Sequence, residues 1–248
     1  MRSKCRFVKK PTFVLFFILF SSAIYAQKND LIHYIGSAYD LKNNTLIYTD
    51  EYKEYLTDNL QLAAKVVYRY PNGDIIATKN IVYSDNFSSP SFSFSNQITG
   101  VLASILVSTS NINIRYRESF DSAFKTKTTS FQEDMVIDAG FHYFIIQNWD
   151  KLIRGKVIPI KYVSPSKQSV FSLQVKKIRS EPWQNKETTL FLLEIRNPIL
   201  RLFLDNIILR YETNSRRLLT YEGLSNIKLL SGAKRVYMTI SHRKGDPY

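Results

Sequence analysis

Only one long stretch of this chain, Asp138 to Lys156, repeats its apolar residues with the period of a helix. Asp138 is placed to cap the first turn of that helix, and Gly155 suits the left-handed residue just past its end. The expected helix has one broad apolar face, which carries Phe141, Phe144, Ile145, Trp149, Leu152 and Ile153. The chain must therefore bury this face against the strands that the remaining sequence predicts.

Short alternating segments separated by turn residues make up most of the rest of the chain. Leu62–Tyr70 alternates apolar and polar residues, and Ile75–Tyr83 returns after Pro71–Asp74, whose Asn-Gly pair favours a tight hairpin. Gly100–Val107 is ambiguous between strand and helix. Leu190–Leu193 is apolar on both faces, which indicates a strand that is covered on both sides. A short second helix is expected from Asn197 and Pro198 through Leu204.

These signals predict a mainly β fold of one domain, residues 27–248. Turns recur at roughly the 8–12-residue spacing of sandwiches and barrels, and the pattern gives about eleven strands. We expect a single strongly curved antiparallel sheet or open barrel, with the long amphipathic helix packed in its concave side.

Residues 1–26 have the pattern of a secretory signal peptide. A basic start is followed by an apolar core from Thr12 to Phe20, and Ala23 and Ala26 offer small cleavage positions. We favour cleavage after Ala26, with cleavage after Ala23 as the alternative. An uncleaved anchor fits less well, because the apolar run is shorter than the ~20 residues that a bilayer span needs. The expected location is the periplasm or the exterior.

Export also changes the charge and the cysteine content. The only cysteine, Cys5, lies in the signal, so the mature chain has no disulfide. Removing five basic residues with the signal lowers the net charge from +13 to +8. The remaining basic residues occur as scattered pairs, which are typical of a solvated surface, although a membrane surface or an acidic partner would also suit them. Nucleic acid is not expected, because the chain has no recognisable nucleic-acid motif.

The residues that could carry chemistry form no convincing set. His33, His142 and His242 have no ligand spacing, so no metal and no cofactor are expected, and His142 is interpreted as an exposed neighbour of Phe141. The adjacent carboxylates of Asp50 and Glu51 would point to opposite sides of a strand and are interpreted as surface, as are Glu133 and Asp134. No catalytic residue is predicted.

Ser164–Lys167 matches the S-x-x-K pattern of penicillin-recognising serine enzymes, and Ser84–Asn86 reads S-D-N. The order of the two elements is reversed relative to those enzymes, Pro165 intervenes, and K-T-G is absent. We therefore interpret Ser164–Lys167 as a loop between two strands. A hydrolase stays the weakest alternative, and a non-enzymatic role is favoured.

The aromatic content is the most informative feature for function. The chain contains 16 Tyr, 16 Phe and 2 Trp, which make 14% of its residues. Aromatic residues favour strands, so ordinary core packing explains many of them. The alternative is that some line a cavity for an apolar ligand between helix and sheet, and the residues predicted to do so are Phe141, Phe144, Ile145, Trp149 and Leu152.

Five segments together resemble a family of uncharacterised exported bacterial proteins: AYDLKNNTLIYTDEY, YPNGDIIATKN, DAGFHYFIIQNWDKL, IKYVSPSK and LLTYEGLSNIK. The resemblance covers most of the mature chain. The stretch after Phe94 departs from the family pattern, and the family has no known activity. A curved sheet around a helix is also distantly similar to periplasmic lipoprotein carriers, and this likeness of shape implies a hydrophobic ligand.

These observations lead to one main hypothesis and two alternatives. The leading hypothesis is an exported soluble protein that binds an apolar or lipid-like molecule between sheet and helix. The first alternative is a cell-envelope scaffold or interaction module that binds another envelope protein or the membrane surface. The weaker alternative is the hydrolase.

Overall fold

The computed structural model describes residues 31–57, 61–197, 206–225, 227–232 and 234–243. The signal peptide predicted for residues 1–26 lies outside these residues, as does nearly all of the short helix predicted from Asn197 to Leu204. No helix in the described ranges is both long enough and apolar enough to span a membrane.

The described residues form fifteen strands and two short helices. In chain order these are β1 (Ile32–Asp40), β2 (Leu46–Leu56), β3 (Leu62–Arg69), β4 (Ile75–Val82), β5 (Ser91–Asn96), β6 (Leu102–Val107), β7 (Asn111–Arg117), β8 (Lys125–Ser130), β9 (Met135–Val136), α1 (Gly140–Gln147), α2 (Trp149–Ile153), β10 (Ile158–Ser164), β11 (Ser169–Trp183), β12 (Lys186–Ile195), β13 (Ile207–Glu212), β14 (Leu218–Leu224) and β15 (Arg235–His242).

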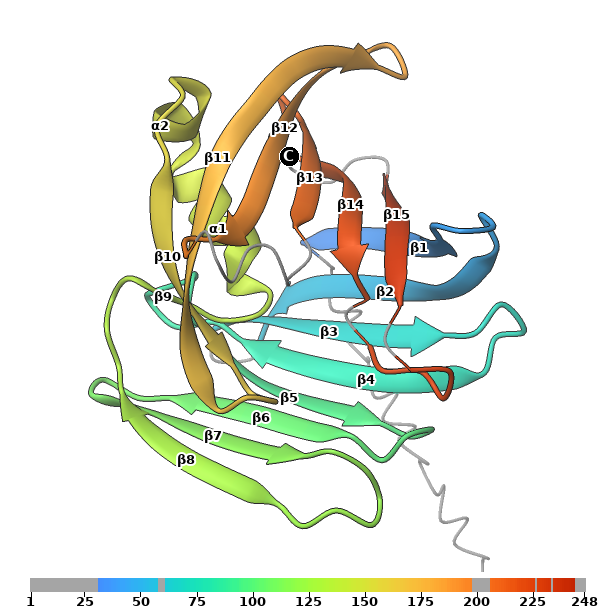
Figure 1. The fold of residues 1–248 in the computed structure, drawn as a ribbon, viewed down its shortest axis with the longest axis vertical. Coiled ribbons are helices and arrows are strands. Elements are labelled where there is room, and N and C mark those ends of the chain that lie inside the picture. The colour runs from blue at the N-terminus through green and yellow to red at the C-terminus, as the bar shows by residue number, and fades with distance from the viewer. Residues whose placement is uncertain (1–30, 58–60, 198–205, 226, 233, 244–248) are drawn as a thin grey trace, which may run out of the picture.

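All the strands belong to one sheet, in the order β8-β7-β6-β5-β4-β3-β2-β1-β15-β14-β13-β12-β11-β10-β9. Strands that follow one another in the chain are neighbours in the sheet, so β1–β8 form one meander and β10–β15 form another. The two meanders are joined in the middle of the sheet, where the first strand, β1, pairs with the last strand, β15 (Figure 1). The pairs are antiparallel, except that β9 runs parallel to β10. The mainly β, single-sheet prediction is confirmed, whereas the count of about eleven strands was too low.

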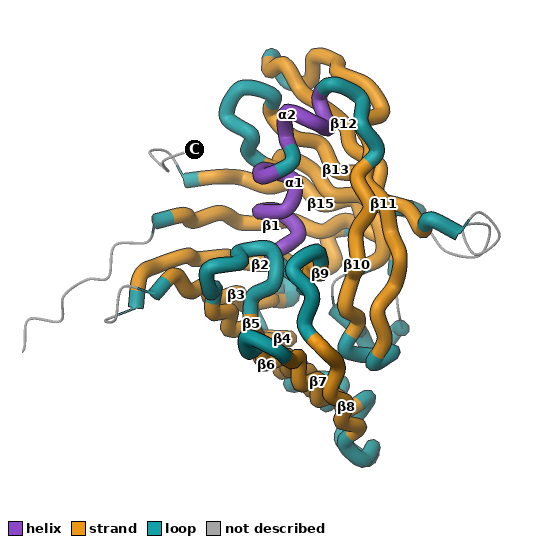
Figure 2. Tube along the Cα trace, turned by 90° about the vertical axis from the view of Figure 1, so that its left-hand side faces the viewer, coloured by secondary structure: helices purple, strands orange, loops and turns teal. Residues whose placement is uncertain are grey.

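The helices contact both halves of the same face of the sheet. Tyr143 of α1 donates a hydrogen bond to Glu54 on β2 (2.7 Å), and Trp149 at the start of α2 packs edge-on against Phe191 on β12, with ring centroids 5.3 Å apart. A single segment can reach both halves only if the sheet curves around it. The helix-bearing face is therefore the concave face, and Figure 2 shows α1 lying between β1–β2 and β10.

The curved sheet does not close into a barrel. Within the described residues its outer strands are β8 and β9, which no backbone ladder joins. They are nevertheless consecutive in the chain, because only residues 131–134 separate them. Lys127 of β8 donates a hydrogen bond to the backbone oxygen of Gln168 (3.0 Å), in the turn between β10 and β11. We call this gap between β8 and the β9–β10 edge the seam.

The prediction of one long helix was wrong, because the segment divides at Asn148. The Asn148 backbone leaves helical geometry (φ −103°, ψ 10°), and its side-chain amide donates to the Phe144 carbonyl (3.0 Å). Asparagine competes with the backbone for such bonds and favours helix ends for that reason. The apolar period continues through this break, which is why the sequence pattern indicated one helix.

The two predicted ends of the helical segment had different outcomes. Gly155 has φ +82° directly after α2, as predicted, and the next amide, Lys156 N–H, donates back to the Lys151 carbonyl (3.0 Å). Asp138 does not cap α1: the N-cap is Ala139, without a side-chain cap bond. The Asp138 carboxylate instead pairs with Lys79 on β4.

Two clusters of buried side chains hold the domain together. The larger cluster is built mainly on β1–β7, and the smaller one joins α1 and α2 to strands β9–β13. Leu190, Phe191 and Leu193 are buried from opposite faces of β12, which confirms the expected double coverage. The Asn-Gly hairpin is also confirmed, with Gly73 at φ +93°.

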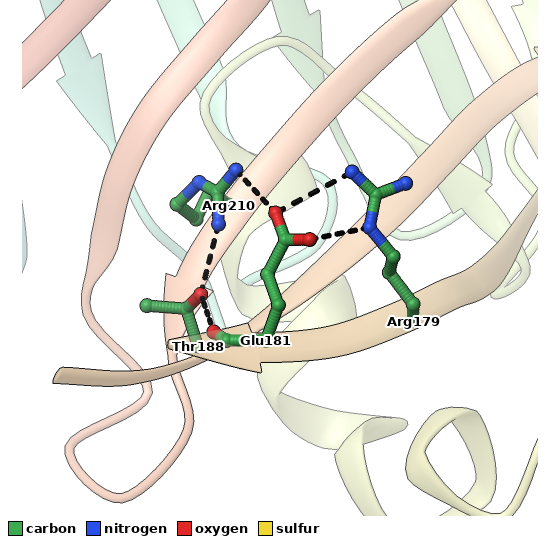
Figure 3. Close-up of polar contacts among 4 residues, drawn as sticks. All are labelled: Arg179, Glu181, Thr188 and Arg210. Atoms are coloured by element: carbon green, nitrogen blue, oxygen red, sulfur yellow. Dashed lines mark hydrogen bonds and ion pairs between the residues drawn. The ribbon is translucent and has the colours of Figure 1, made fainter. Parts of the chain in front are cut away.

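A polar cluster fastens the long β11–β12 hairpin to β13 (Figure 3). The Arg210 guanidinium donates to Thr188 Oγ1 (2.9 Å) and to Glu181 Oε1 (2.8 Å), while Arg179 approaches the same carboxylate from its more exposed side. The Arg210 side chain is only 13% exposed, so its charge needs these partners. We assign this cluster a structural role, because its members satisfy one another.

Replacing Trp149 tests the smaller core cluster. Its ring is 4% exposed and packs edge-on against Phe191 and Tyr211. Trp149→Ala is expected to lower the free energy of unfolding by about 3–5 kcal/mol, because it leaves a cavity in a packed core. Chemical denaturation measures the change. Trp183→Ala is the matched control: Trp183 is half-buried and contacts Arg210 at 5.5 Å, so a loss of about 1 kcal/mol is expected. Equal losses for the two variants would contradict this assignment of the core.

Candidate functional site

Four of the five predicted cavity residues lie deep in the smaller core cluster. Phe144 is 9% exposed and Trp149 4%, while Ile145 and Leu152 have no exposed surface. Phe141 is half-buried, and its ring stacks against Phe144 at a centroid distance of 6.4 Å. The structure thus brings all five together between helices and sheet. Their contact with a ligand stays a prediction.

Two hollows of the surface are lined by other residues. The larger, about 590 Å³, lies against β6–β8 and includes the side chains of Leu106, Asn113 and Thr128. These residues alternate with the buried Ile105 and Ile112, so the hollow is on the convex side of the sheet. The smaller, about 420 Å³, lies at the end of β2–β3 beside Tyr83 and Phe87.

The sequence interpretation missed a polar group of residues on the concave face. Strand β2 points Tyr48, Asp50, Tyr52 and Glu54 to one side, and all four are buried. The expectation that Asp50 and Glu51 point to opposite sides is confirmed. The interpretation of Asp50 as surface was wrong, because it shares the concave face with Tyr48 and Tyr52.

Asp50 lies against Gly36, its cross-strand partner on β1. A Cβ atom at position 36 would lie 2.1 Å from Asp50 Oδ1 and 2.9 Å from Met238 Sδ, so only glycine leaves room for this carboxylate. Asp50 is 7% exposed, and Oδ1 has no hydrogen-bond partner among the described residues. Burial raises the pKa of Asp50 to about 6, against the opposing effect of Lys79.

Glu54 is held by phenols. Tyr52 and Tyr143 both donate to Glu54 Oε1, at 2.9 and 2.7 Å, and the Tyr52 and Tyr83 hydroxyls lie 3.0 Å apart. Glu54 is 2% exposed, and burial raises its pKa although the two phenols lower it. These bonds connect α1 to β2 and to Tyr83, the residue that follows β4, through side chains alone.

Lys79 and Asp138 form an ion pair at the start of the helical segment. Lys79 Nζ lies 2.7 Å from Asp138 Oδ1 and 2.8 Å from Oδ2, and the Lys79 side chain is 9% exposed. The ammonium also lies 5.7 Å from the ring centre of Phe92 and 5.9 Å from that of Phe94. Asp138 adopts φ +43°, which aspartate tolerates better than most residues.

Several tyrosines around these charges keep some exposed surface. Tyr34, Tyr162 and Tyr221 are half-buried, yet burial is the main cause that raises the pKa of each phenol. Asp50 contributes to the raised pKa of Tyr34, and Asp138 to that of Tyr162. These three tyrosines lie deep in the fold and still keep some exposed side-chain surface, as residues that line an accessible interior would. We call this set, with Asp50, Glu54, Lys79 and Asp138, the concave polar site.

His142 is not the exposed residue that the sequence indicated. It is half-buried on α1, its ring lies parallel to that of Tyr211 at 5.8 Å, and its Nδ1 lies 3.3 Å from the Tyr211 hydroxyl. Burial lowers the pKa of His142 to about 4. Across the described ranges, no three His, Cys, Asp or Glu side chains come together as a metal site would require.

The S-x-x-K sequence lies in a turn between two strands, as predicted. Ser164 ends β10, and residues 165–168 form the turn into β11, closed by a bond from Gln168 N–H to the Pro165 carbonyl (3.2 Å). Ser164 and Lys167 line neither of the two hollows. This turn therefore gives the serine mechanism no support.

Comparison with known proteins supports the fold. No family model matches the chain, and no curated protein matches it significantly. The solved structure of a beta-barrel-like protein of the domain of unknown function DUF1849, from Brucella abortus, is similar over 88% of this chain and all of that one, with TM-score 0.50 and 8% identity. A DUF1329 family protein from Desulfovibrio piger matches at TM-score 0.30 and 8% identity, over 86% and 82% of the two chains.

The first likeness shows a beta-barrel-like fold, and at 8% identity it shows nothing further. It agrees with the expectation that the chain resembles uncharacterised proteins, because that neighbour is described as a domain of unknown function. The chemistry of the concave polar site therefore has to be argued from this chain's own residues.

The charge on Asp50 gives a test by pH. Because burial raises its pKa from 3.8 to about 6, the native state favours the protonated acid. The contribution of Asp50 to the free energy of unfolding, about 3 kcal/mol, is fully present below pH 4 and is lost as the pH rises through 6. Relative to Asp50→Asn, the wild type should therefore become less stable between pH 4 and pH 7 in denaturant unfolding.

Glu51→Gln is the matched control for this prediction. The neighbouring Lys53 and His33 lower the pKa of Glu51, so its contribution is present above pH 4.5 and lost as the pH falls. Its difference from wild type should be small and of opposite sign. A pH-independent difference for Asp50→Asn would contradict the buried charge.

Removing one partner tests the Lys79–Asp138 pair. Lys79→Met leaves the Asp138 carboxylate without its ammonium and is expected to lower the free energy of unfolding by about 3 kcal/mol, as measured by urea denaturation. Lys161→Met removes a pair with Asp134 whose side chains are 44% and 59% exposed. That control should lose less than about 1 kcal/mol. If both variants lost the same amount, the pair would have no special part in holding α1.

Proposed function

We propose that this protein is exported and binds an apolar or lipid-like ligand on the concave face of its sheet, beside α1. The observation that carries the proposal is the set of deep but half-buried tyrosines, Tyr34, Tyr162 and Tyr221, around the concave polar site. Small-molecule sites are typically concave and mostly aromatic or apolar, with a few polar groups that fix orientation. The signal-peptide pattern of residues 1–26 supports export.

The packing suggests which part of the interior would hold the ligand. The space around Ile145 and Leu152 is occupied, since neither side chain has exposed surface. Phe141 and Tyr143 of α1, in contrast, are half-buried, and Tyr143 contacts Glu54 on β2 and Tyr83 just after β4. A ligand would therefore lie along α1 toward β1 and β2, with Phe141 and its neighbours forming one end.

The seam supports entry of such a ligand. A closed barrel admits ligands through its ends, whereas this sheet also has a gap that side chains such as Lys127 bridge. The two edge strands of the sheet, β8 and β9, argue against the scaffold alternative, in which a partner protein would bind a sheet edge. Strand β8 has six residues and carries Lys125 and Lys127, and β9 has two residues. Short, lysine-bearing edges disfavour the addition of a partner's strand.

Lipid extraction and a binding titration test the proposal. Extraction of the purified protein followed by mass spectrometry should yield a co-purifying lipid, and a fluorescent fatty-acid analogue should bind with saturation. Tyr162→Ala should weaken that binding about tenfold, because it removes a large apolar surface from the interior. Leu106→Ala, at the convex hollow, is the control and should leave binding unchanged.

Two outcomes would count against this function. If extraction gives no lipid and the analogue does not bind, the interior is not a ligand site and the scaffold alternative becomes the better one. If Leu106→Ala weakens binding and Tyr162→Ala does not, the analogue occupies the convex hollow.

A further inference from the structure

We propose that the ligand of the concave polar site carries a cationic, hydrogen-bond-donating head, a primary ammonium group, which Asp50 Oδ1 receives beside the ring of Tyr34. This inference rests on the proposed function and adds the chemical class of the ligand: an aliphatic amine or a lipid with an amine head.

The first step is the state of Asp50. It is 93% buried, since its exposed fraction is 7%, and Oδ1 lacks a partner within the described part of the chain. Its position over Gly36, near Met238, places it on the concave face. Backbone amides of Gly36 and Asp50 favour the ionised carboxylate, but a buried oxygen without a partner of its own is unfavourable, because its loss of hydration is not made up. A donor from outside the described chain would complete the site.

The neighbouring charges do not fill that role. Lys79 is close enough to lower the pKa of Asp50, but its ammonium contacts both oxygens of Asp138. Glu54 already accepts from Tyr52 and Tyr143. Two carboxylates, those of Asp50 and Asp138, thus stand near one ammonium. The local excess of negative charge favours a cation and disfavours a fatty acid or a phosphate.

An organic cation suits the site better than a metal ion. The carboxylates of Asp50, Glu54 and Asp138 do not converge on a point, since the described residues contain no group of three potential ligands. Tyr34 shares a strand face with Gly36, and its ring stacks on Tyr52 with centroids 4.7 Å apart and planes at 7°. Aromatic faces attract ammonium groups, most strongly when water is excluded.

The groups that could alter the charge of Asp50 come from each element around it. They are Tyr34 on β1, Glu54 on β2, Tyr68 on β3, Lys79 on β4, Asp138 before α1, and His242 on β15, whose ring lies 5.5 Å from that of Tyr34. The tyrosines have raised pKa values and stay neutral at working pH. Asp50 is then the group whose ionisation near pH 6 would change the binding of an amine.

The experiment compares three probes with the same chain length: dodecylamine, dodecanol and dodecanoic acid, each below its micelle concentration, titrated into the purified protein by calorimetry at pH 7.5. We expect dodecylamine to bind about 10- to 100-fold more tightly than dodecanoic acid, the range of one charge-assisted hydrogen bond. In Asp50→Asn this preference should fall to within about threefold, while dodecanol binds as before. Glu51→Gln, on the opposite face, should keep the preference.

A pH titration of the wild type gives an independent measurement that requires no variant. The amine stays protonated, so its affinity should fall as the pH is lowered through 6, whereas the affinity for dodecanol should not change. Equal affinities for amine and acid, or a preference that survives in Asp50→Asn, would overturn the inference while leaving the proposed function intact. Failure of all three probes to bind would overturn both.

Discussion

The pairing of the first strand with the last is the interaction on which the rest of this structure depends. Seven residue pairs, from Tyr34 with His242 to Asp40 with Val236, join two meanders that would otherwise be separate open sheets. An ion pair between Lys234 and Asp40 (2.9 Å) fastens one end of this ladder. The concave polar site draws residues from β1, β2 and β4 in one half and from β10 and β14 in the other, so it exists only where the two halves are joined.

The site itself follows from the two-residue period of strands. On β2 this period places two acids, Asp50 and Glu54, on the same face as two tyrosines, and on β4 it places Lys79 between Ala77 and Ile81. Such residues would weaken an ordinary core, because each charge loses water on burial. Phenols and an ion pair compensate Glu54, Lys79 and Asp138. Asp50 is the member whose compensation is incomplete.

Local patterns predicted the strands and the tight turns well, because alternation and glycine placement act over a few residues. They predicted one helix where there are two, since the apolar period runs across Asn148 while the backbone does not. The alternation Tyr48-x-Asp50-x-Tyr52 on β2 was visible in the sequence, but because Asp50 is adjacent to Glu51, both acids were interpreted as surface residues. Which face is buried depends on curvature, and Lys79 meets Asp138 from 59 residues away, beyond the reach of any local pattern.

The seam has a mechanical consequence. In a closed barrel the number and stagger of the strands fix the radius, since every backbone group is committed to a neighbour. Here the sheet stays open between β8 and β9. Backbone hydrogen bonds therefore set the spacing between neighbouring strands but not the distance across the interior. That distance is held by what stands between the walls, chiefly α1 with its Tyr143–Glu54 bond. The helix acts as a spacer between the two walls of the sheet. The width of the interior can therefore change without loss of any backbone hydrogen bond between strands.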